Sequence, residues 1–414
     1  MAKNLKLFDQ NACDTYLLNE DLWEKVDERT SGSVNLCFQC GECTAVCPWG
    51  IVKEGALKVR SILRGAQLGI EDWEKDIWLC TNCDQCQLYC PRGVQIGDVF
   101  QALRSISWEK REVESGLPGM LWSIYWNDNP WSQPPSERFA WAGNSNVPVY
   151  DPSKHEFLLY IGCTSSFDNR LQRVAQALVR VLTAAGVRFG CLGAAEPCCG
   201  EPVKSVGHAP YFYETARSTI RVFKDAGVEK VITLSPHCYD VFKNHYNKVL
   251  EEEQFEVVHY SQILADLLEG GKVEFSSEWI ARALENHYSW VTPEEILVTF
   301  QDPCYLGRKN NEYRAPRTLL SGIPGIKFLE MENHMQDGLC CGGGGGRMWL
   351  ETPPGERFSD IRVMQALETG ASILATACPF CLVCLEDSMR ALGKENMFVL
   401  DVAELLDVAI AKPG

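Results

Sequence analysis

Two runs of cysteines with the same spacing constrain the fold of this chain more than any other feature. The first is Cys37-x2-Cys40-x2-Cys43-x3-Cys47-Pro48, and the same spacing recurs from Cys80 to Pro91. A tight loop of this kind brings three thiols to one place and directs the fourth, which enters a helix, toward a neighbouring site. Both segments must therefore fold around something that thiolates bind.

The whole chain has 20 cysteines in 414 residues, for which disulfides, zinc and iron–sulfur clusters are the three explanations. The N-terminus lacks the apolar segment of a secretory signal, so we expect a cytoplasmic protein whose thiols stay reduced. Zinc sites usually use C-x2-C pairs, whereas the two runs match the bacterial two-cluster ferredoxin pattern. A zinc-dependent scaffold without a redox role remains as the alternative from another class.

The ferredoxin pattern assigns the cysteines to two [4Fe–4S] cubane clusters that exchange their fourth ligands. We predict one cluster on Cys37, Cys40, Cys43 and Cys90, and the other on Cys80, Cys83, Cys86 and Cys47. Between the runs, the apolar residues from Ala56 to Ala66 have helical spacing, which predicts a mostly helical ferredoxin domain.

The charge of the chain excludes some partners. With 39 Lys and Arg against 55 Asp and Glu, the net charge is −16, which repels phosphate backbones and anionic lipids. No apolar stretch reaches the roughly 18 residues of a membrane span. We therefore expect no nucleic-acid binding and no direct membrane span, and contact with a membrane would need a partner. An acidic surface also suits docking to a basic patch on another protein.

The rest of the chain alternates short apolar runs with helical patterns. Runs at 156–162, 231–234, 296–300 and 372–376 predict buried parallel strands, and Asp168 is placed to cap the helix that follows the first run. The corresponding cysteines of two halves lie 141 to 143 residues apart, which indicates an internal duplication. The predicted fold is a multidomain α+β protein, with a helical ferredoxin domain before a duplicated, Rossmann-like α/β unit.

We divide the chain into five parts on these grounds. They are a lead-in (1–34), the helical double-cluster ferredoxin domain (35–110), a connection rich in Trp and Pro (111–152), a first α/β half (153–270) and a second α/β half (291–414).

The second half carries five cysteines, Cys304, Cys340, Cys341, Cys378 and Cys381. Five thiolates are more than a zinc ion or a cubane needs, so they favour an iron–sulfur assembly of unusual geometry. Five glycines follow the cysteine pair, and their N–H groups can approach anionic sulfides closely. We predict that Gly342, Gly343 and Gly344 contact the cofactor, with a flexible turn as the alternative.

The first half is incomplete. It retains Cys163, Cys198, Cys199 and Cys238, but Ser235 stands where the second half has Cys378. Two interpretations stay open: the four thiolates hold a further cluster, with Ser235 or water at an open corner, or this half is a structural relic.

Several reactive side chains fall outside these sets. Cys13, Cys191 and Cys384 are best explained as buried or incidental thiols. His237, His334 and Arg347 lie near predicted clusters, where one could donate a proton or polarise a substrate, but single residues of this kind are more often structural.

The duplicated cysteine pattern resembles the CCG domain found in the B-type polypeptide of heterodisulfide reductase, and the double ferredoxin motif resembles the C-type polypeptide of that enzyme. Together, over residues 35–410, the chain resembles the D type, in which the two are fused. The resemblance implies a noncubane [4Fe–4S] cluster on Cys304, Cys340, Cys341, Cys378 and Cys381 that binds a disulfide and reduces it, or forms it in reverse, one electron at a time.

The family includes other functions. Related chains relay electrons in glycolate, lactate and glycerol-3-phosphate dehydrogenases, in electron-bifurcating complexes and in benzoyl-CoA reductase assemblies, so a relay role is the alternative function. No flavin motif of the G-x-G-x-x-G type follows a strand here. The expected partners in a hetero-oligomer are therefore a flavoprotein similar to the A-type polypeptide of heterodisulfide reductase and a donor such as a hydrogenase or formate dehydrogenase.

Overall fold

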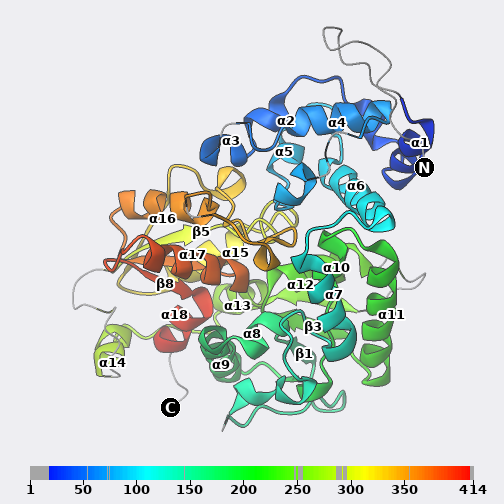
Figure 1. Ribbon diagram of the computed structural model, residues 1–414. Helices are drawn as coiled ribbons and strands as arrows, with labels where there is room; N and C mark the ends of the chain where they lie inside the picture. The colour runs from blue at the N-terminus through cyan, green and yellow to red at the C-terminus, as the bar shows by residue number, and fades with distance from the viewer. Residues whose placement is uncertain are drawn as a thin grey trace.

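The computed structural model describes residues 18–53, 55–71, 73, 75–143, 145–246, 249, 255–285, 291, 296–353 and 355–410. A helical ferredoxin domain forms one end of the molecule, and two α/β halves form a larger body beside it (Figure 1). Among the described residues, no helix combines the length and the apolar character needed to cross a bilayer.

The two cysteine runs share one backbone design. A 3-10 turn precedes each run, at η1 (Ser33–Leu36) and η2 (Asp76–Leu79), and each run carries a one-turn helix, α2 (Glu42–Ala45) or α5 (Gln85–Leu88). Two residues at matching positions are left-handed, Gln39 and Gly41 with φ of 67° and 94° in the first loop, and Asn82 and Asp84 with φ of 52° and 58° in the second. These bends curl each loop around its thiols.

The remaining helices of the ferredoxin domain are α1 (Glu20–Arg29), α3 (Trp49–Val52), α4 (Val59–Leu68) and α6 (Ile96–Lys110). Helix α4 lies in the segment predicted to be helical, and its apolar side packs between α1 and α6. Helix α7 (Gly116–Asn127) and the short turns η3 (Pro135–Glu137) and η4 (Ala140–Ala142) connect this domain to the body.

Each α/β half contains a four-stranded parallel sheet, with strand order β2-β1-β3-β4 in the first half and β6-β5-β7-β8 in the second. The strands are β1 (Phe157–Tyr160), β2 (Phe189–Gly190), β3 (Lys230–Thr233), β4 (Glu256–His259), β5 (Ile296–Gln301), β6 (Ile326–Leu329), β7 (Ile373–Thr376) and β8 (Phe398–Asp401). The four predicted strands are confirmed, and they are the inner pairs. The outer strands were not predicted: β2 has two residues, β4 and β6 are only partly buried, and β8 is buried but is one short run of four residues.

Helices surround both sheets. In the first half they are α8 (Cys163–Phe167), α9 (Asn169–Ala184), α10 (Glu201–Ser205), α11 (Ala209–Asp225), α12 (Pro236–Asn244) and α13 (Tyr260–Glu269). Helix α14 (Trp279–Glu285) leads to the second half, which has α15 (Arg314–Gly322), α16 (Phe358–Glu368), α17 (Pro379–Ala391) and α18 (Val402–Ala409). As predicted, Asp168 caps α9 by accepting the N–H groups of Arg170 and Leu171.

The two halves exchange helix contacts and share one core. The last helix of each half packs against the first long helix of the other, α13 on α15 and α18 on α9. Across this seam the buried Tyr260 hydroxyl donates to Asp401 at 2.6 Å, and Arg170 pairs with Glu386 and Glu404. The duplicated unit is therefore a single packed body (Figure 1).

A buried arginine joins the ferredoxin domain to this body. Arg104 on α6 is fully buried, and its guanidinium donates to the carbonyls of Ile77 and Cys80 in the ferredoxin domain and to that of Ser205 in the first half. Asn82 also donates to the Ser205 carbonyl, at 3.1 Å. Because these acceptors are buried, they need donors from the protein, and Arg104 supplies one to each of them.

The glycines after Cys341 allow the second half to approach the ferredoxin loop. A Cβ on Gly344 would overlap the Thr81 carbonyl oxygen, and a Cβ on Gly345 would overlap the Cys80 carbonyl oxygen. Two backbones can come this close only where no side chain stands between them.

We predict that Gly344→Ala destabilises the protein by about 1–3 kcal/mol, because the added methyl must displace a backbone rather than a flexible side chain. Chemical denaturation of the anaerobically prepared protein measures the change. Gly119→Ala is the control, since nothing lies within 4 Å of a Cβ at that helical position, and it is expected to stabilise α7 by roughly 0.5–1 kcal/mol. An unchanged stability in Gly344→Ala would show that the two loops are not in close contact.

We also predict that Arg104→Met costs about 3 kcal/mol of stability, since it leaves several buried carbonyls without donors. The same substitution at the exposed Arg92 of this domain is expected to change stability by less than about 0.5 kcal/mol. Limited proteolysis of the 111–152 connection provides a second measurement, because looser docking exposes it. Equal effects of the two substitutions would contradict the role of Arg104.

Candidate iron–sulfur sites

The structure brings together the second predicted cubane set. Cys47, Cys80, Cys83 and Cys86 line one enclosed cavity of about 30 Å³, also bordered by Trp49 and Phe358. Burial and the neighbouring thiols Cys80 and Cys83 raise the pKa of Cys86, and burial raises that of Cys80 to about 11. Cys47 comes from the other run, so the thiol predicted as the fourth ligand lies with the cysteines of the second run.

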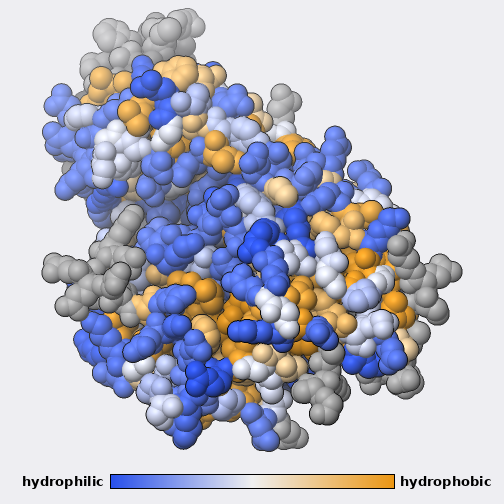
Figure 2. Space-filling model, turned by 180° about the vertical axis from the view of Figure 1, so that it is seen from behind, coloured by the Kyte–Doolittle hydropathy of each residue, from blue (hydrophilic) through white to orange (hydrophobic). Residues whose placement is uncertain are grey.

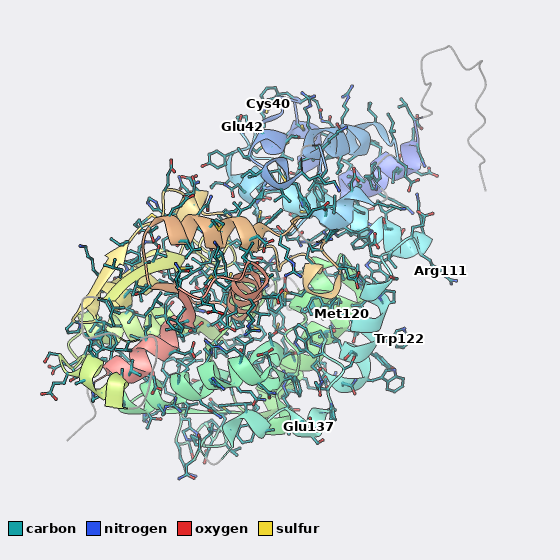
Figure 3. All side chains as sticks on the ribbon, turned by 60° about the vertical axis from the view of Figure 1, so that its left-hand side comes forward. Cys40, Glu42, Arg111, Met120, Trp122 and Glu137 are labelled. Atoms are coloured by element: carbon teal, nitrogen blue, oxygen red, sulfur yellow. The ribbon has the colours of Figure 1, made fainter. Side chains whose placement is uncertain are left out.

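The other predicted set lies at the far end of the ferredoxin domain. Burial raises the pKa of Cys43 to about 11, with smaller contributions from Cys37 and Cys40. Cys90 follows α5, which packs against α2 of the first run. Cys40 is exposed, and it lies with Glu42 at the outer edge of the domain (Figure 3). This set therefore faces solvent, whereas the second set faces the α/β body.

The five cysteines of the second half are all buried. Their thiols interact in sequence, Cys304 with Cys340, Cys340 with Cys341, Cys341 with Cys381 and Cys381 with Cys378. The N–H of Gly342 donates to the Cys340 sulfur at 3.3 Å. Of the three glycines predicted to contact a cofactor, Gly342 thus donates to the sulfur of a predicted ligand, Gly343 lies near Cys384 and Met348, and Gly344 packs on the ferredoxin loop.

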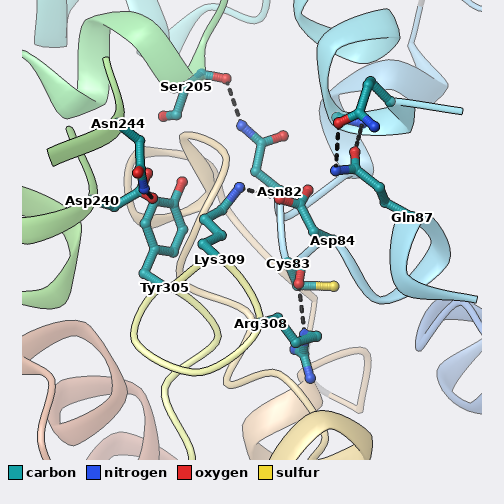
Figure 4. Close-up of polar contacts among 12 residues, drawn as sticks. Asn82, Cys83, Asp84, Gln87, Ser205, Asp240, Asn244, Tyr305, Arg308 and Lys309 are labelled. Atoms are coloured by element: carbon teal, nitrogen blue, oxygen red, sulfur yellow. Dashed lines mark hydrogen bonds and ion pairs between the residues drawn. The ribbon is translucent and has the colours of Figure 1, made fainter. Parts of the chain in front are cut away.

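The ferredoxin domain and the second half meet at their cysteines. A hydrogen bond with Cys340 and burial raise the pKa of Cys83, and the Cys340 sulfur lies 3.7 Å from the Thr81 hydroxyl. Arg308 donates to the Cys83 carbonyl at 2.7 Å, and Lys309 pairs with Asp84 (Figure 4). Sequence reasoning missed both basic residues, whose only signal was their position shortly after Cys304.

Three polar side chains, His237, Tyr305 and Glu201, lie together between the two halves, beside the cysteines of the second half. The His237 ring stacks on Tyr305 with centroids 3.8 Å apart and lies near Phe380. Glu201 accepts from the Tyr305 hydroxyl at 2.6 Å and lies 3.4 Å from His237. Burial disfavours the imidazolium, but Glu201 and Cys378 raise the pKa of His237 to about 10. The first half thereby places a polar side chain beside a thiol of the second.

A wide cleft opens next to the second half's cysteines. Its volume is about 980 Å³, and its inner wall contains Cys341, Gly342, Gly343 and Cys384. Arg347 lies on the rim, where it donates to Thr352 at 2.6 Å and lies over the Trp49 ring. The cleft is large enough for a small-molecule ligand. Hydrophilic residues cover much of the visible surface of the molecule (Figure 2).

The four cysteines of the first half also converge. Cys163, Cys198, Cys199 and Cys238 are buried, and their thiols interact as neighbours in that order. They line a separate cavity of about 30 Å³ that also includes Ser235. The buried Arg138, which the sequence did not single out, donates to the Cys163 sulfur and to Glu196, both at 3.3 Å.

The other thiols and His334 lie apart from these sets. Cys191 is buried in the core of the first half, and Cys384 is half-buried with its sulfur 3.7 Å from that of Met348. The His334 ring contacts the carbonyls of Met331 and Glu332. Cys13 lies outside the described residues.

The donor sets fit iron–sulfur clusters. They consist of thiols, most of them buried, and in three sets a backbone N–H donates to a cysteine sulfur: Asn82 to Cys80, Gly200 to Cys198 and Gly342 to Cys340. Such N–H groups stabilise the negative charge of a cluster. Among the described residues, no group of three or more His, Cys, Asp or Glu side chains is arranged to hold a single metal ion.

Two family models match this chain. A 4Fe-4S dicluster domain covers residues 33–94, and a cysteine-rich domain, CCG, covers residues 157–243 and again 298–386. A hypothetical protein from Helicobacter pylori has a similar fold, with a TM-score of 0.51 at 11% identity over 96% of this chain and 74% of that one.

Three curated relatives illustrate the range of the family. The probable iron-sulfur-binding oxidoreductase FadF of Bacillus subtilis is 35% identical over 71% of this chain, and the EtfAB:quinone oxidoreductase of Syntrophomonas wolfei is 37% identical over 68%. The chain spans only 41% and 39% of those two proteins. The D-type polypeptide of the dihydromethanophenazine:CoB–CoM heterodisulfide reductase of Methanosarcina barkeri is 30% identical over 91% of this chain and 94% of its own length.

The last of these matches runs nearly end to end in both proteins, and it includes the dicluster domain and both cysteine-rich repeats. The chain is an oxidoreductase-type iron–sulfur protein, and it belongs to the family of D-type heterodisulfide reductase polypeptides.

Proposed function

We propose that this protein is the iron–sulfur catalytic component of a heterodisulfide reductase-like complex, in which electrons enter at the ferredoxin domain and reduce a disulfide at the second α/β half. The observation that carries the proposal is the approach of Cys340 to the Cys80–Cys83 loop, where the Cys340 sulfur lies 3.7 Å from the Thr81 hydroxyl and Gly344 packs on the Thr81 carbonyl. Residues proposed as ligands of two different clusters are neighbours there, across the junction between the two domains.

The positions of the cysteines suggest where electrons would enter the protein and where they would go. The exposed set around Cys40 faces the surface, where a donor protein can reach it. The set around Cys83 lies in a cavity walled by the ferredoxin domain and by Phe358 of the second half. When bound, two cubanes and one noncubane cluster would supply one-electron transfer along this line. Arg308 and Lys309 hold the Cys83 loop against the second half and keep the last two sets adjacent.

The cleft of about 980 Å³ is the proposed substrate site, because it borders Cys341 and opens to the outside. A disulfide takes up two electrons and two protons and gives two thiols, so two electrons must arrive in succession from the donor. Arg347 on the rim is placed to orient a polar group of the substrate.

The proposed partners are inferred from two features of the sequence, the lack of a flavin-binding motif after a strand and the negative net charge. With no flavin-binding motif after a strand, the hydride-accepting flavin would belong to a separate flavoprotein, with a hydrogenase or formate dehydrogenase as a further donor. The acidic surface, with a net charge of −16, suits a basic docking face on that partner.

A relay role is the second candidate, and a specific observation favours it. The first two relatives named above are an oxidoreductase and an EtfAB:quinone oxidoreductase, and both are more than twice as long as the region that they share with this chain. In that case the chain would pass electrons between a flavoprotein and another acceptor, and the cleft would bind no disulfide.

We predict that Cys340→Ser abolishes disulfide-dependent chemistry while leaving the protein folded. The anaerobically prepared protein is oxidised with and without a heterodisulfide or a simple disulfide, and electron paramagnetic resonance records the response. A disulfide-dependent signal should appear in the natural protein and vanish in the variant, because Cys340 is a proposed ligand of the reacting centre.

Cys384→Ser is the matched control, since Cys384 lines the same cleft but lies outside the proposed ligand sets. It should keep the signal. A natural protein that contains the clusters but shows no response to any thiol or disulfide would favour the relay function. A colourless, iron-free protein would instead support the zinc scaffold.

A further inference from the structure

We propose that the first α/β half holds its own four-thiolate [4Fe–4S] cluster on Cys163, Cys198, Cys199 and Cys238, closed to substrate, with Ser235 acting as a helix cap rather than as a ligand. The proposal rests on the function proposed above, in that it adds a fourth electron-carrying centre to the same protein. It replaces the two open interpretations of this half by one.

The hydroxyl of Ser235 is engaged in a hydrogen bond with the backbone. Ser235 is the N-cap of α12, and its hydroxyl accepts the N–H of His237 at 3.3 Å. Serine is among the preferred residues for this purpose. The matching Cys378 also stands before a proline at the start of a helix, but its side chain caps nothing and interacts with Cys381 and His237. The substitution therefore exchanges a fifth thiol for a cap and leaves four thiols.

The four remaining thiols keep the local support found in the complete half. The N–H of Gly200 donates to the Cys198 sulfur at 3.4 Å, as that of Gly342 does to Cys340 at 3.3 Å. Both glycines have positive φ, 75° and 90°. The two halves therefore share the same backbone donor at equivalent cysteines, which favours a bound group in the first half as well as in the second.

Buried charge also points to a ligand. Arg138 is 1% exposed, and its guanidinium donates to the Cys163 sulfur, the Glu196 carboxylate and the Pro197 carbonyl. Glu196 in turn accepts the N–H groups of Ile161 and Gly162. A buried guanidinium aimed at a cysteine sulfur stabilises a thiolate on that cysteine, which is the form that binds iron.

The shape of the site favours a cubane over a second reacting centre. Its cavity of about 30 Å³ matches in size the cavity of the ferredoxin set on Cys47, Cys80, Cys83 and Cys86, and each is lined by four cysteines. The second half instead opens on a cleft of about 980 Å³. Four enclosed thiolates are the usual ligand set of an electron-transfer cluster.

The position indicates what such a cluster would do. Cys238 directly follows His237, whose ring centroid lies 4.5 Å from that of Phe380, between Cys378 and Cys381 of the second half. The first-half cluster would thus adjoin the centre where the disulfide is reduced. Because each cluster passes one electron at a time and the disulfide needs two, a closed neighbouring cluster can hold the second electron while the first is transferred to the disulfide.

The test measures iron, acid-labile sulfide and the reduced-state electron paramagnetic resonance spectrum of the full-length protein, prepared anaerobically. Cys163→Ser is expected to lose about four iron atoms per chain, the content of one [4Fe–4S] cluster, together with one component of the spectrum. Cys191→Ser is the matched control, since Cys191 is a buried thiol of the same half outside the set, and it should lose neither.

The variant Ser235→Ala tests whether Ser235 caps helix α12 or binds iron. It should keep all the iron and melt at a lower temperature, whereas loss of a cluster in this variant would identify Ser235 as a ligand and overturn the proposal. Cys238→Ser, which lies on α12 rather than on α8, replaces Cys163→Ser if that variant does not fold. Unchanged iron in both cysteine variants would also overturn it. If Cys340→Ser still loses a cluster in that case, the function proposed above survives and only the first-half site is rejected.

Discussion

The contact between the Cys80–Cys83 loop and the loop from Cys340 to Gly345 is the constraint on which the rest of the structure depends. The two backbones approach so closely that glycine is required on one side. Arg308 and Lys309 of the second half bind the Cys83 carbonyl and Asp84, and Arg104 joins the Cys80 carbonyl to the first half. Electron transfer between cofactors needs proximity, and here proximity is built largely from hydrogen bonds to main-chain carbonyls. The junction between the domains therefore depends on buried main-chain groups of both parts.

Much of this arrangement was predictable from spacing. Cysteine periodicity identified the crossover of Cys47 to the second run, and the offset between the halves identified the duplication. The inner strands were predictable because they are buried on both faces and read as continuous apolar runs. The outer strands were not: β2 has only two residues, and β4 and β6 are mostly half-exposed.

The long-range contacts were beyond sequence reasoning. Nothing local to Arg104 or Arg138 shows that the side chain is buried, and Gly344 reads as a flexible turn until the Thr81 carbonyl is seen beside it. Pairwise interactions between residues far apart in sequence decide these roles. The same applies to Ser235, whose replacement of a cysteine looks like a loss until its hydrogen bond to the backbone is known.

The enclosure of Cys83 has a consequence for the assembly of the protein in the cell. Because that loop is sealed against the second half by Gly344 and Gly345, the machinery that inserts iron and sulfide has access to it only before the domains close on each other. The set around the exposed Cys40 has no such restriction. Maturation should therefore follow an order, with the inner centres filled first, and a chain that closes early would be trapped with its outer end complete and its interior empty.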